Sequence, residues 1–242
     1  MVRKADPRGF RTKAALSRPV RINLVILGGS RAFGTAFPDC DWDYYGVFSY
    51  PLPQVVSLYP GRESYCWQAG EMDFSFHELR KFLKLALAGN PTVLDTLFAP
   101  EVVYQDPTGA VLRHVREAFL SKRILSCYLG YASNQLERYK RGSRLHSKTG
   151  GLNPKFISHA LRLLYGGIHL AKTGEFIVRL PDDVLGGIVA LREGDPERAI
   201  EKVTLMRDCL AQMKDGCGLP EEPDTALVEE FQWNCRKRTW LP

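Results

Sequence analysis

The fold of this chain is decided by the segment Leu24-Val-Ile-Leu-Gly-Gly-Ser-Arg-Ala-Phe-Gly-Thr-Ala-Phe-Pro-Asp-Cys-Asp-Trp-Asp-Tyr-Tyr-Gly-Val-Phe48. Its apolar start, Leu24 to Leu27, stops at two glycines, which is typical of a buried strand followed by a turn. A short stretch that can form a helix comes next, and a second apolar run follows it. We therefore expect two neighbouring strands of one sheet, joined through a glycine turn and a short helix.

The turn Gly28-Gly29-Ser30 has the features of a phosphate-binding turn. Glycine has no Cβ, so its backbone can approach a ligand closely. Ser30 is a favoured N-cap for a helix that continues through Arg31, and free N–H groups at a helix start attract phosphate oxygens. The turn lacks the Gly-Lys-Ser/Thr of a Walker A sequence and the glycine spacing of a Rossmann turn. A plain turn without a ligand is the alternative interpretation.

Two carboxylates, Asp41 and Asp43, open the second apolar run. Residues i and i+2 of a strand point to the same face, so these two groups would converge and repel each other. A divalent cation relieves that repulsion, and Mg²⁺ prefers oxygen ligands and keeps positions for substrate phosphates. A solvated strand edge is the alternative for the acids alone. The turn and the acids together predict a site for a nucleoside triphosphate bridged by Mg²⁺ or Mn²⁺.

A third carboxylate is expected in the segment Glu71-Met-Asp-Phe-Ser-Phe76, which alternates between polar and apolar residues. Such alternation is typical of a strand with one buried face, and its polar face carries Glu71 and Asp73. A two-metal site for phosphoryl transfer uses several oxygen ligands. Asp73 is central in the strand and is the predicted third ligand, with Glu71 as the alternative. An exposed strand without a metal would show the same pattern.

These residues resemble the DNA polymerase β-type nucleotidyltransferase superfamily, whose signature is a Gly-Gly/Ser turn, an Asp-x-Asp or Asp-x-Glu pair and a distant third acid. Within it, the chain is similar to the YcgL-like branch of predicted bacterial and phage nucleotidyltransferases. The similarity lies in Gly29-Ser-Arg-Ala-Phe-Gly34 and Pro38-Asp-Cys-Asp-Trp-Asp43, and it extends from about residue 23 to residue 181. The branch often has an arginine shortly after its second acid, where Tyr44-Tyr45-Gly46 stands here, which puts the detailed nucleotide contacts in question.

The resemblance implies transfer of a nucleoside monophosphate from a nucleoside triphosphate, such as ATP, to an acceptor hydroxyl, with release of pyrophosphate. It implies that Asp41, Asp43 and Asp73 are catalytic and bind the metals, and that the glycine turn binds the β and γ phosphates. The acceptor stays open between an RNA 3′ end, a small molecule and a protein. The alternative function is a non-catalytic nucleotide-binding or interaction protein on the same fold.

The later part of the chain is predicted to be helical, because the apolar period changes from two to about 3.6 at His77. Helices are expected at about 109–120, 122–141, 154–173, 196–214 and 225–236. The fold class is therefore α+β, with an N-terminal polymerase β-like mixed sheet and helices, followed by a C-terminal helical domain. The predicted domains are a basic arm at 1–20, a catalytic domain at 21–107 and a helical domain at 108–242.

Two basic features of the helical part could contact phosphate. Lys155, His159 and Arg162 are spaced to share one helix face, and the similar pattern in the YcgL-like branch favours a role in nucleotide binding. A plain exposed helix face is the alternative. The loop Arg141 to Gly151 is basic and glycine-rich, and it is expected either to contact phosphate or to be a solvated loop.

Composition bounds the class of protein. The 33 basic and 27 acidic residues give a net charge of +6, which suits an anionic ligand but does not by itself establish a nucleic-acid partner. The six cysteines include no Cys-x-x-Cys pair, so a zinc site is not expected. We expect the cysteines to be reduced thiols in a cytoplasmic protein. No apolar run reaches membrane-spanning length, so no membrane association is expected.

Overall fold

The computed structural model describes residues 20–36, 40–141 and 154–238. Contacts between Cα atoms group the chain into two compact units, and each is described by itself. The first unit takes Met1–Leu87, Thr92–Phe119 and Asp224–Pro242, and the second takes Ala88–Pro91 and Leu120–Pro223, as far as these ranges are described. The grouping puts residues 108–119 and 224–238 with the sheet, and the expected domain boundary after residue 107 stays a prediction.

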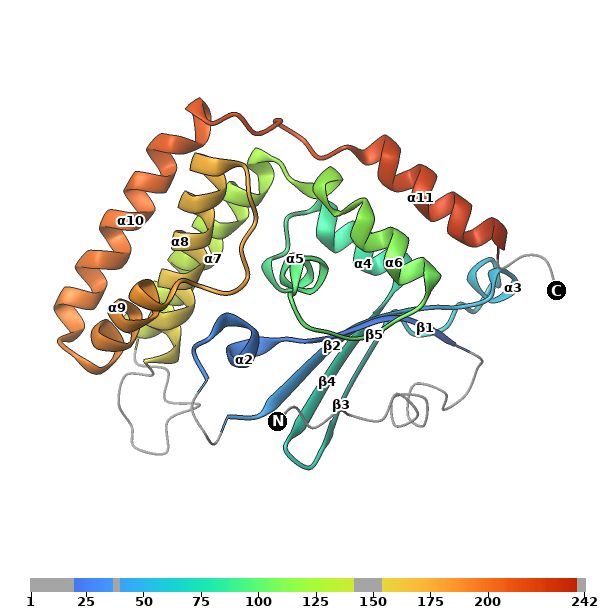
Figure 1. The fold of residues 1–242 in the computed structure, drawn as a ribbon, viewed down its shortest axis with the longest axis horizontal. Coiled ribbons are helices and arrows are strands. Elements are labelled where there is room, and N and C mark those ends of the chain that lie inside the picture. Colours follow the sequence, from blue (N-terminus) through green and yellow to red (C-terminus); the bar gives the residue numbers. More distant parts are fainter. Residues whose placement is uncertain (1–19, 37–39, 142–153, 239–242) are drawn as a thin grey trace. The chain divides into compact units, whose positions relative to one another are not determined.

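The first unit is built on a five-stranded mixed sheet in the order β3-β4-β2-β1-β5 (Figure 1). Its strands are β1 (Arg21–Leu27), β2 (Trp42–Ser49), β3 (Ser64–Ala69), β4 (Met72–Glu78) and β5 (Val102–Gln105). Strand β1 pairs antiparallel with β2 and β5, β3 pairs antiparallel with β4, and only the pairing of β2 with β4 is parallel. The expected neighbouring strands on either side of the glycine turn are thus β1 and β2.

The first unit also contains helices that pack on the sheet or connect its strands. They are α2 (Gly29–Phe33), α3 (Leu52–Val55), α4 (Leu79–Leu87), α5 (Pro91–Phe98), α6 (Pro107–His114), the 3₁₀ turn η1 (Arg116–Phe119) and α11 (Thr225–Arg238). Helices α4, α5 and α6 lie on one side of the sheet (Figure 1). The mixed sheet with its helices confirms the predicted α+β class.

The second unit, as far as it is described, is helical. Its helices are α7 (Lys122–Lys140), α8 (Lys155–Thr173), α9 (Asp182–Glu193) and α10 (Pro196–Gly216). Helices α7, α8 and α10 pack against one another, and Gly167 of α8 lies close to α10, since a Cβ there would be 2.8 Å from Leu210 Cδ2. None of the described helices is long and apolar enough to cross a membrane.

Two predicted boundaries differ from the structure. The helix after β4 begins at Leu79 rather than His77, because pairing with β2 continues through the register pair of Phe48 with Glu78. The expected helix at 109–120 is two elements, α6 and η1, and α6 begins at Pro107. Asp106 is its N-cap, and its Oδ1 accepts the N–H of Gly109 at 2.8 Å.

One face of the sheet carries an aromatic cluster. The ring of Phe74 stacks between Trp67 at 4.7 Å and Tyr44 at 5.2 Å, measured between ring centroids. Gly46 leaves room for Phe76, since a Cβ there would lie 2.8 Å from that ring. Because strand residues alternate between faces, the residues between these aromatic positions project from the other face. The predicted acid positions of β2 and β4 are among them.

A buried ion pair joins helix α11 to strand β4 of the sheet. Arg236 Nη2 donates to Glu78 Oε1, and Nη1 donates to the carbonyl oxygen of Tyr50 at 3.1 Å. The second carboxylate oxygen of Glu78 accepts the backbone N–H of Arg80 at 2.7 Å. The two charged side chains are 6% and 7% exposed, so each depends on the other for its compensating charge.

We expect Arg236→Met to lower the free energy of unfolding by about 3–5 kcal/mol, because it leaves the Glu78 carboxylate buried without its partner. Urea unfolding followed by circular dichroism measures this. The double variant Arg236→Met with Glu78→Leu should recover part of the loss. As a control, Arg80→Met removes an exposed pair with Glu63 and should cost less than about 1 kcal/mol. Equal losses for the two single variants would contradict the assignment.

Candidate active site

The glycine turn after β1 is held directly against β2. The N–H of Gly28 donates to the carbonyl oxygen of Asp43 at 2.8 Å. Gly28 lies flat on the ring of Tyr45, and a Cβ at this position would overlap that ring. Hence the backbone of the turn and the second predicted acid form one local structure.

Gly29 makes the closest contact in the site. Its φ is +60°, in the left-handed region, and a Cβ here would overlap Oδ2 of Asp43. Both the backbone conformation and the lack of space require glycine. The turn therefore lies immediately against the Asp43 carboxylate.

The predicted N-cap role of Ser30 was wrong. Helix α2 begins at Gly29 and its N-cap is Gly28, which has an extended backbone and makes no side-chain cap bond. Ser30 is already inside the helix, and its carbonyl oxygen accepts the N–H of Thr35 at 2.9 Å. The extended backbone of Gly28 places the helix start two residues earlier than the usual preference of serine for the cap indicates. A contact between the Ser30 hydroxyl and phosphate stays a prediction.

The parallel pairing of β2 with β4 brings the predicted second and third acids together. Asp43 and Asp73 are register partners, on the same face of adjacent strands about 4.8 Å apart. Glu71, the alternative third acid, precedes β4, and its carbonyl oxygen accepts the N–H of Trp42 at 2.8 Å. The register thus places Asp73 rather than Glu71 beside Asp43. Asp41 lies one residue before β2 and is exposed.

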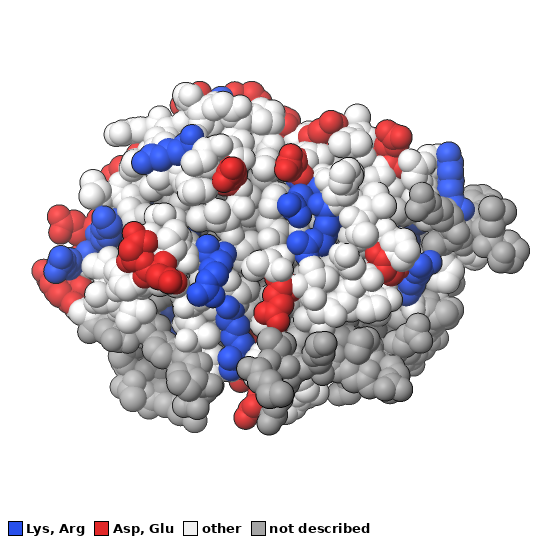
Figure 2. Space-filling model, viewed as in Figure 1, with Lys and Arg blue, Asp and Glu red and all other residues white. Residues whose placement is uncertain are grey.

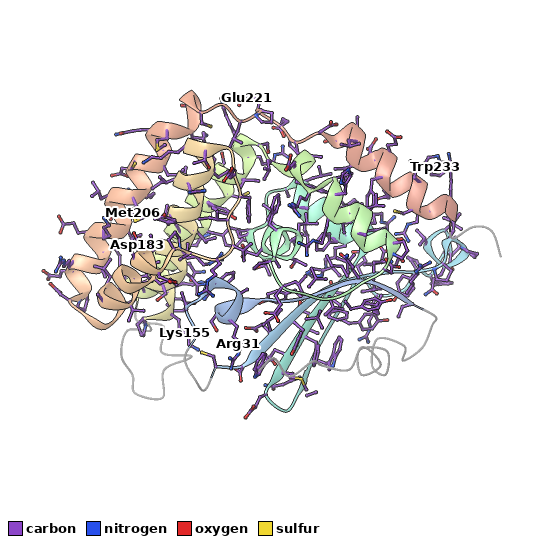
Figure 3. All side chains as sticks on the ribbon, viewed as in Figure 1. Arg31, Lys155, Asp183, Met206, Glu221 and Trp233 are labelled. Atoms are coloured by element: carbon purple, nitrogen blue, oxygen red, sulfur yellow. The ribbon has the colours of Figure 1, made fainter. Side chains whose placement is uncertain are left out.

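Arg31 of α2 positions the backbone that carries Asp41, a role that was not predicted from the sequence. Its Nη2 donates to the carbonyl oxygen of Cys40 at 2.7 Å, and its Nε donates to that of Asp41 at 3.4 Å. Figure 3 labels Arg31. The guanidinium also lies over the ring of Trp42, 3.9 Å from its centroid. The feature of the sequence that pointed to this role was that Arg31 directly follows Gly29-Ser30 in the motif shared with the YcgL-like branch. Arg31 is a positioning residue for the segment before β2.

The donor set suits a hard divalent cation. Within the described ranges no three His, Cys, Asp or Glu side chains lie close enough together to hold a metal ion. Asp43 and Asp73 nevertheless face each other across one strand pair, and Asp41 is two residues away in sequence. Carboxylate oxygens are the ligands that Mg²⁺ prefers, so Asp43 and Asp73 have the right chemistry for Mg²⁺ or Mn²⁺, and the predicted site with all three acids stays a prediction.

The predicted basic residues Lys155, His159 and Arg162 lie on α8, in the second unit (Figure 3 labels Lys155). Desolvation, followed by the charges of Arg162 and Lys155, lowers the pKa of His159 to about 4. His159 is therefore neutral at pH 7, and the positive charge of this face comes from the other two residues. Their role in nucleotide binding stays a prediction.

Two further predicted features, the basic arm at 1–20 and the loop 141–151, fall outside the described residues except for Val20 and Arg141.

The comparisons with known proteins place the chain in a family. Residues 11–199 match the family model RlaP, described as an RNA repair pathway DNA polymerase beta family. The chain is 30% identical to Bacillus subtilis protein YcgL over 132 residues, which are 53% of this chain and 51% of YcgL. It is 26% identical to protein MJ0002 of Methanocaldococcus jannaschii over 157 residues, 63% of this chain and 61% of that one.

A third relative is the 38.9 kDa protein of the nrdC-mobD intergenic region of phage T4, which is 30% identical over 130 residues, 48% of this chain and 38% of the phage protein. The chain thus spans between about two fifths and three fifths of the length of these relatives. A nucleotidyltransferase-like protein from Exiguobacterium sibiricum aligns over 97% of this chain and 80% of its own, with a TM-score of 0.30 and 11% identity.

Gly29→Ala should destabilise the first unit more than Gly70→Ala does. Both glycines have φ near +60°, and Gly70 has nothing within 4 Å of a built Cβ. Gly70→Ala therefore measures the left-handed backbone alone, about 1–2 kcal/mol. Gly29→Ala adds the overlap with Asp43 and should exceed it by about 2 kcal/mol or more in urea unfolding. Equal losses would show that Asp43 moves aside without cost.

The pKa of His159 should be measurable by NMR titration. Because desolvation and the two neighbouring positive charges disfavour the charged imidazole, we expect a midpoint lowered from the ordinary 6.5 toward about 4. The lowered pKa means that the unfolded chain binds a proton first, so this residue reduces stability as pH falls through that window. The double variant Lys155→Gln with Arg162→Gln should raise the midpoint. A midpoint above 6.5 in the unchanged protein would contradict the assignment.

Proposed function

The chain belongs to the RNA repair pathway DNA polymerase beta family, and on this premise we propose that it is a metal-dependent nucleotidyltransferase. The observation that carries the proposal is the register pair of Asp43 with Asp73, with Gly29 packed on the Asp43 carboxylate. In the proposed reaction, an acceptor hydroxyl oxygen bonds to the α-phosphorus of a nucleoside triphosphate. The bond from that phosphorus to the bridging oxygen breaks, and pyrophosphate leaves.

Each residue of the site has a proposed task. Asp41, Asp43 and Asp73 would hold Mg²⁺ or Mn²⁺, which when bound would supply positive charge to the attacking and leaving oxygens. Asp73 also accepts the proton of the acceptor hydroxyl. The backbone of Gly28 and Gly29, with the Ser30 hydroxyl, holds the β and γ phosphates.

The proposed acceptor is the 3′ hydroxyl of an RNA rather than a small molecule or a protein. The description of the family names an RNA repair pathway. The net charge of +6 is compatible with a polyanion.

The test is incubation of the protein with each of four labelled nucleoside triphosphates, Mg²⁺ or Mn²⁺, and an RNA oligonucleotide with a 3′ hydroxyl. Labelled RNA and stoichiometric pyrophosphate are expected. Asp43→Asn and Asp73→Asn should each lower turnover more than about 100-fold, since loss of a ligand exceeds the 10–100-fold cost of an outer-shell partner. The metal affinity of each variant, measured by calorimetry with Mn²⁺, should fall in parallel.

Glu71→Gln is the matched control, because this exposed carboxylate lies two residues from Asp73 and outside the register pair. It should retain turnover. A variant series in which Glu71→Gln abolishes turnover while Asp73→Asn does not would assign the third acid to Glu71. Binding of nucleoside triphosphate with no product on any acceptor would instead favour a non-catalytic nucleotide-binding protein.

A further inference from the structure

An open pocket lies at the β5 edge of the sheet, entirely within the first unit. Its volume is about 740 Å³, and its walls come from β5, α6 and η1. The polar side chains in these walls are those of Gln105, Arg113, His114, Arg116 and Glu117. Nothing in the proposed transfer reaction uses these residues.

Arg113 has hydrogen-bonding capacity that the described residues leave unused. Its Nη2 donates to the carbonyl oxygen of Ala99 at 3.0 Å, whereas its Nη1 is buried and has no hydrogen-bond partner. A buried N–H group left unpaired costs about 1–3 kcal/mol, and more when it is charged. Desolvation and the charge of Arg116 lower the pKa of Arg113. The two guanidinium groups thus repel each other in a place where water screens them poorly.

No acid compensates these two charges. Among residues 20–36, 40–141 and 154–238, neither Arg113 nor Arg116 forms an ion pair with a carboxylate, although Glu117 lies in the same wall. Arg116 instead lies over the ring of Phe98, 5.3 Å from its centroid. The positive charge of basic residues in the last turn of α6 interacts favourably with the helix dipole. The dipole provides no hydrogen-bond acceptor for Arg113 Nη1, however, and Arg116 lies beyond the end of that helix.

The pocket lies on the strand that borders the glycine turn. Val102, in its wall, is the register partner of Ile26, and the N–H of Leu27 donates to the carbonyl oxygen of Glu101 at 3.3 Å. Val102 is thus one strand across and two residues along from Gly28, which is roughly 8 Å for ordinary strand spacing and rise. A chain of phosphates that reaches the turn can reach this edge as well.

We propose that the pocket of Arg113 and Arg116 binds a backbone phosphate of the polynucleotide acceptor. Paired guanidinium groups match the geometry of phosphate oxygens and hold them with bidentate, charge-assisted hydrogen bonds. Lys and Arg form separate groups with Asp and Glu among them on the face shown in Figure 2, so a local pocket rather than one broad basic surface would position the strand. The acceptor's identity rests on the proposed function.

The test is the affinity of the full chain for a 5′-labelled single-stranded RNA, measured by fluorescence anisotropy over a range of salt concentrations. Arg116→Gln should raise the dissociation constant about tenfold at low salt. It should also lower the slope of log affinity against log salt by about 0.7, the value for one phosphate contact on a single strand. Arg116→Lys should leave the salt slope unchanged. Arg113→Lys should lower the affinity for RNA and also leave the salt slope unchanged. The affinity for Mg²⁺-bound nucleoside triphosphate should stay unchanged in all three.

Arg80→Gln is the matched control, because Arg80 pairs with Glu63 next to β3, at the opposite edge of the sheet. It should leave RNA affinity and its salt slope unchanged. Equal RNA affinity for Arg116→Gln and Arg80→Gln would overturn the proposal, as would loss of triphosphate affinity alone, since the phosphate would then belong to the donor. RNA binding that depends on Arg116 in a protein without transferase activity would support the pocket and overturn the proposed reaction.

Discussion

The parallel pairing of β2 with β4 is the constraint on which the candidate site depends. It sets Asp43 against Asp73 on one face, and on the other face the stacked rings of Tyr44 and Phe74 hold the same register. A slip of one residue would turn the acids toward the aromatic cluster and the rings toward the opposite face. The apolar packing of the sheet therefore fixes the spacing of the two carboxylates, although none of the aromatic rings needs to touch a substrate.

A second constraint ties the phosphate turn to the same strand. The contact of Gly29 with Asp43 leaves no volume for a side chain, and Arg31 holds the backbone of Cys40 and Asp41 from the other side of the turn. The short helix α2 thus contacts β2 through Gly29 and the segment before β2 through Arg31. A substitution that moves α2 would therefore displace both the glycine turn and the backbone that carries Asp41.

The sequence predicted features that depend on nearby residues. The glycine turn, the acid pair and the alternating strand of Asp73 are local patterns, and the long helices of the second unit have clear apolar periodicity. Strand β5 and helix α9 were not predicted from the sequence. Strand β5 is only four residues long, and α9 contains Gly186 and Gly187, which disfavour helix formation. The sequence favoured Asp73 over Glu71 for its central place in the strand, and only the register of β2 with β4 sets Asp73 beside Asp43. The pairing of Arg236 with Glu78 spans 158 residues, for which no local pattern exists.

The ion pair between α11 and the sheet has a consequence for biosynthesis. The strands of the first unit are translated early, but the helix that neutralises Glu78 is translated only after the whole of residues 120–223. The second unit is nearly continuous in sequence and can complete its packing on the ribosome before the first unit can. Domains usually fold in the order of their synthesis, and here the order of completion is reversed. The ion pair of Glu78 with Arg236 can therefore form only after α11 has been synthesised.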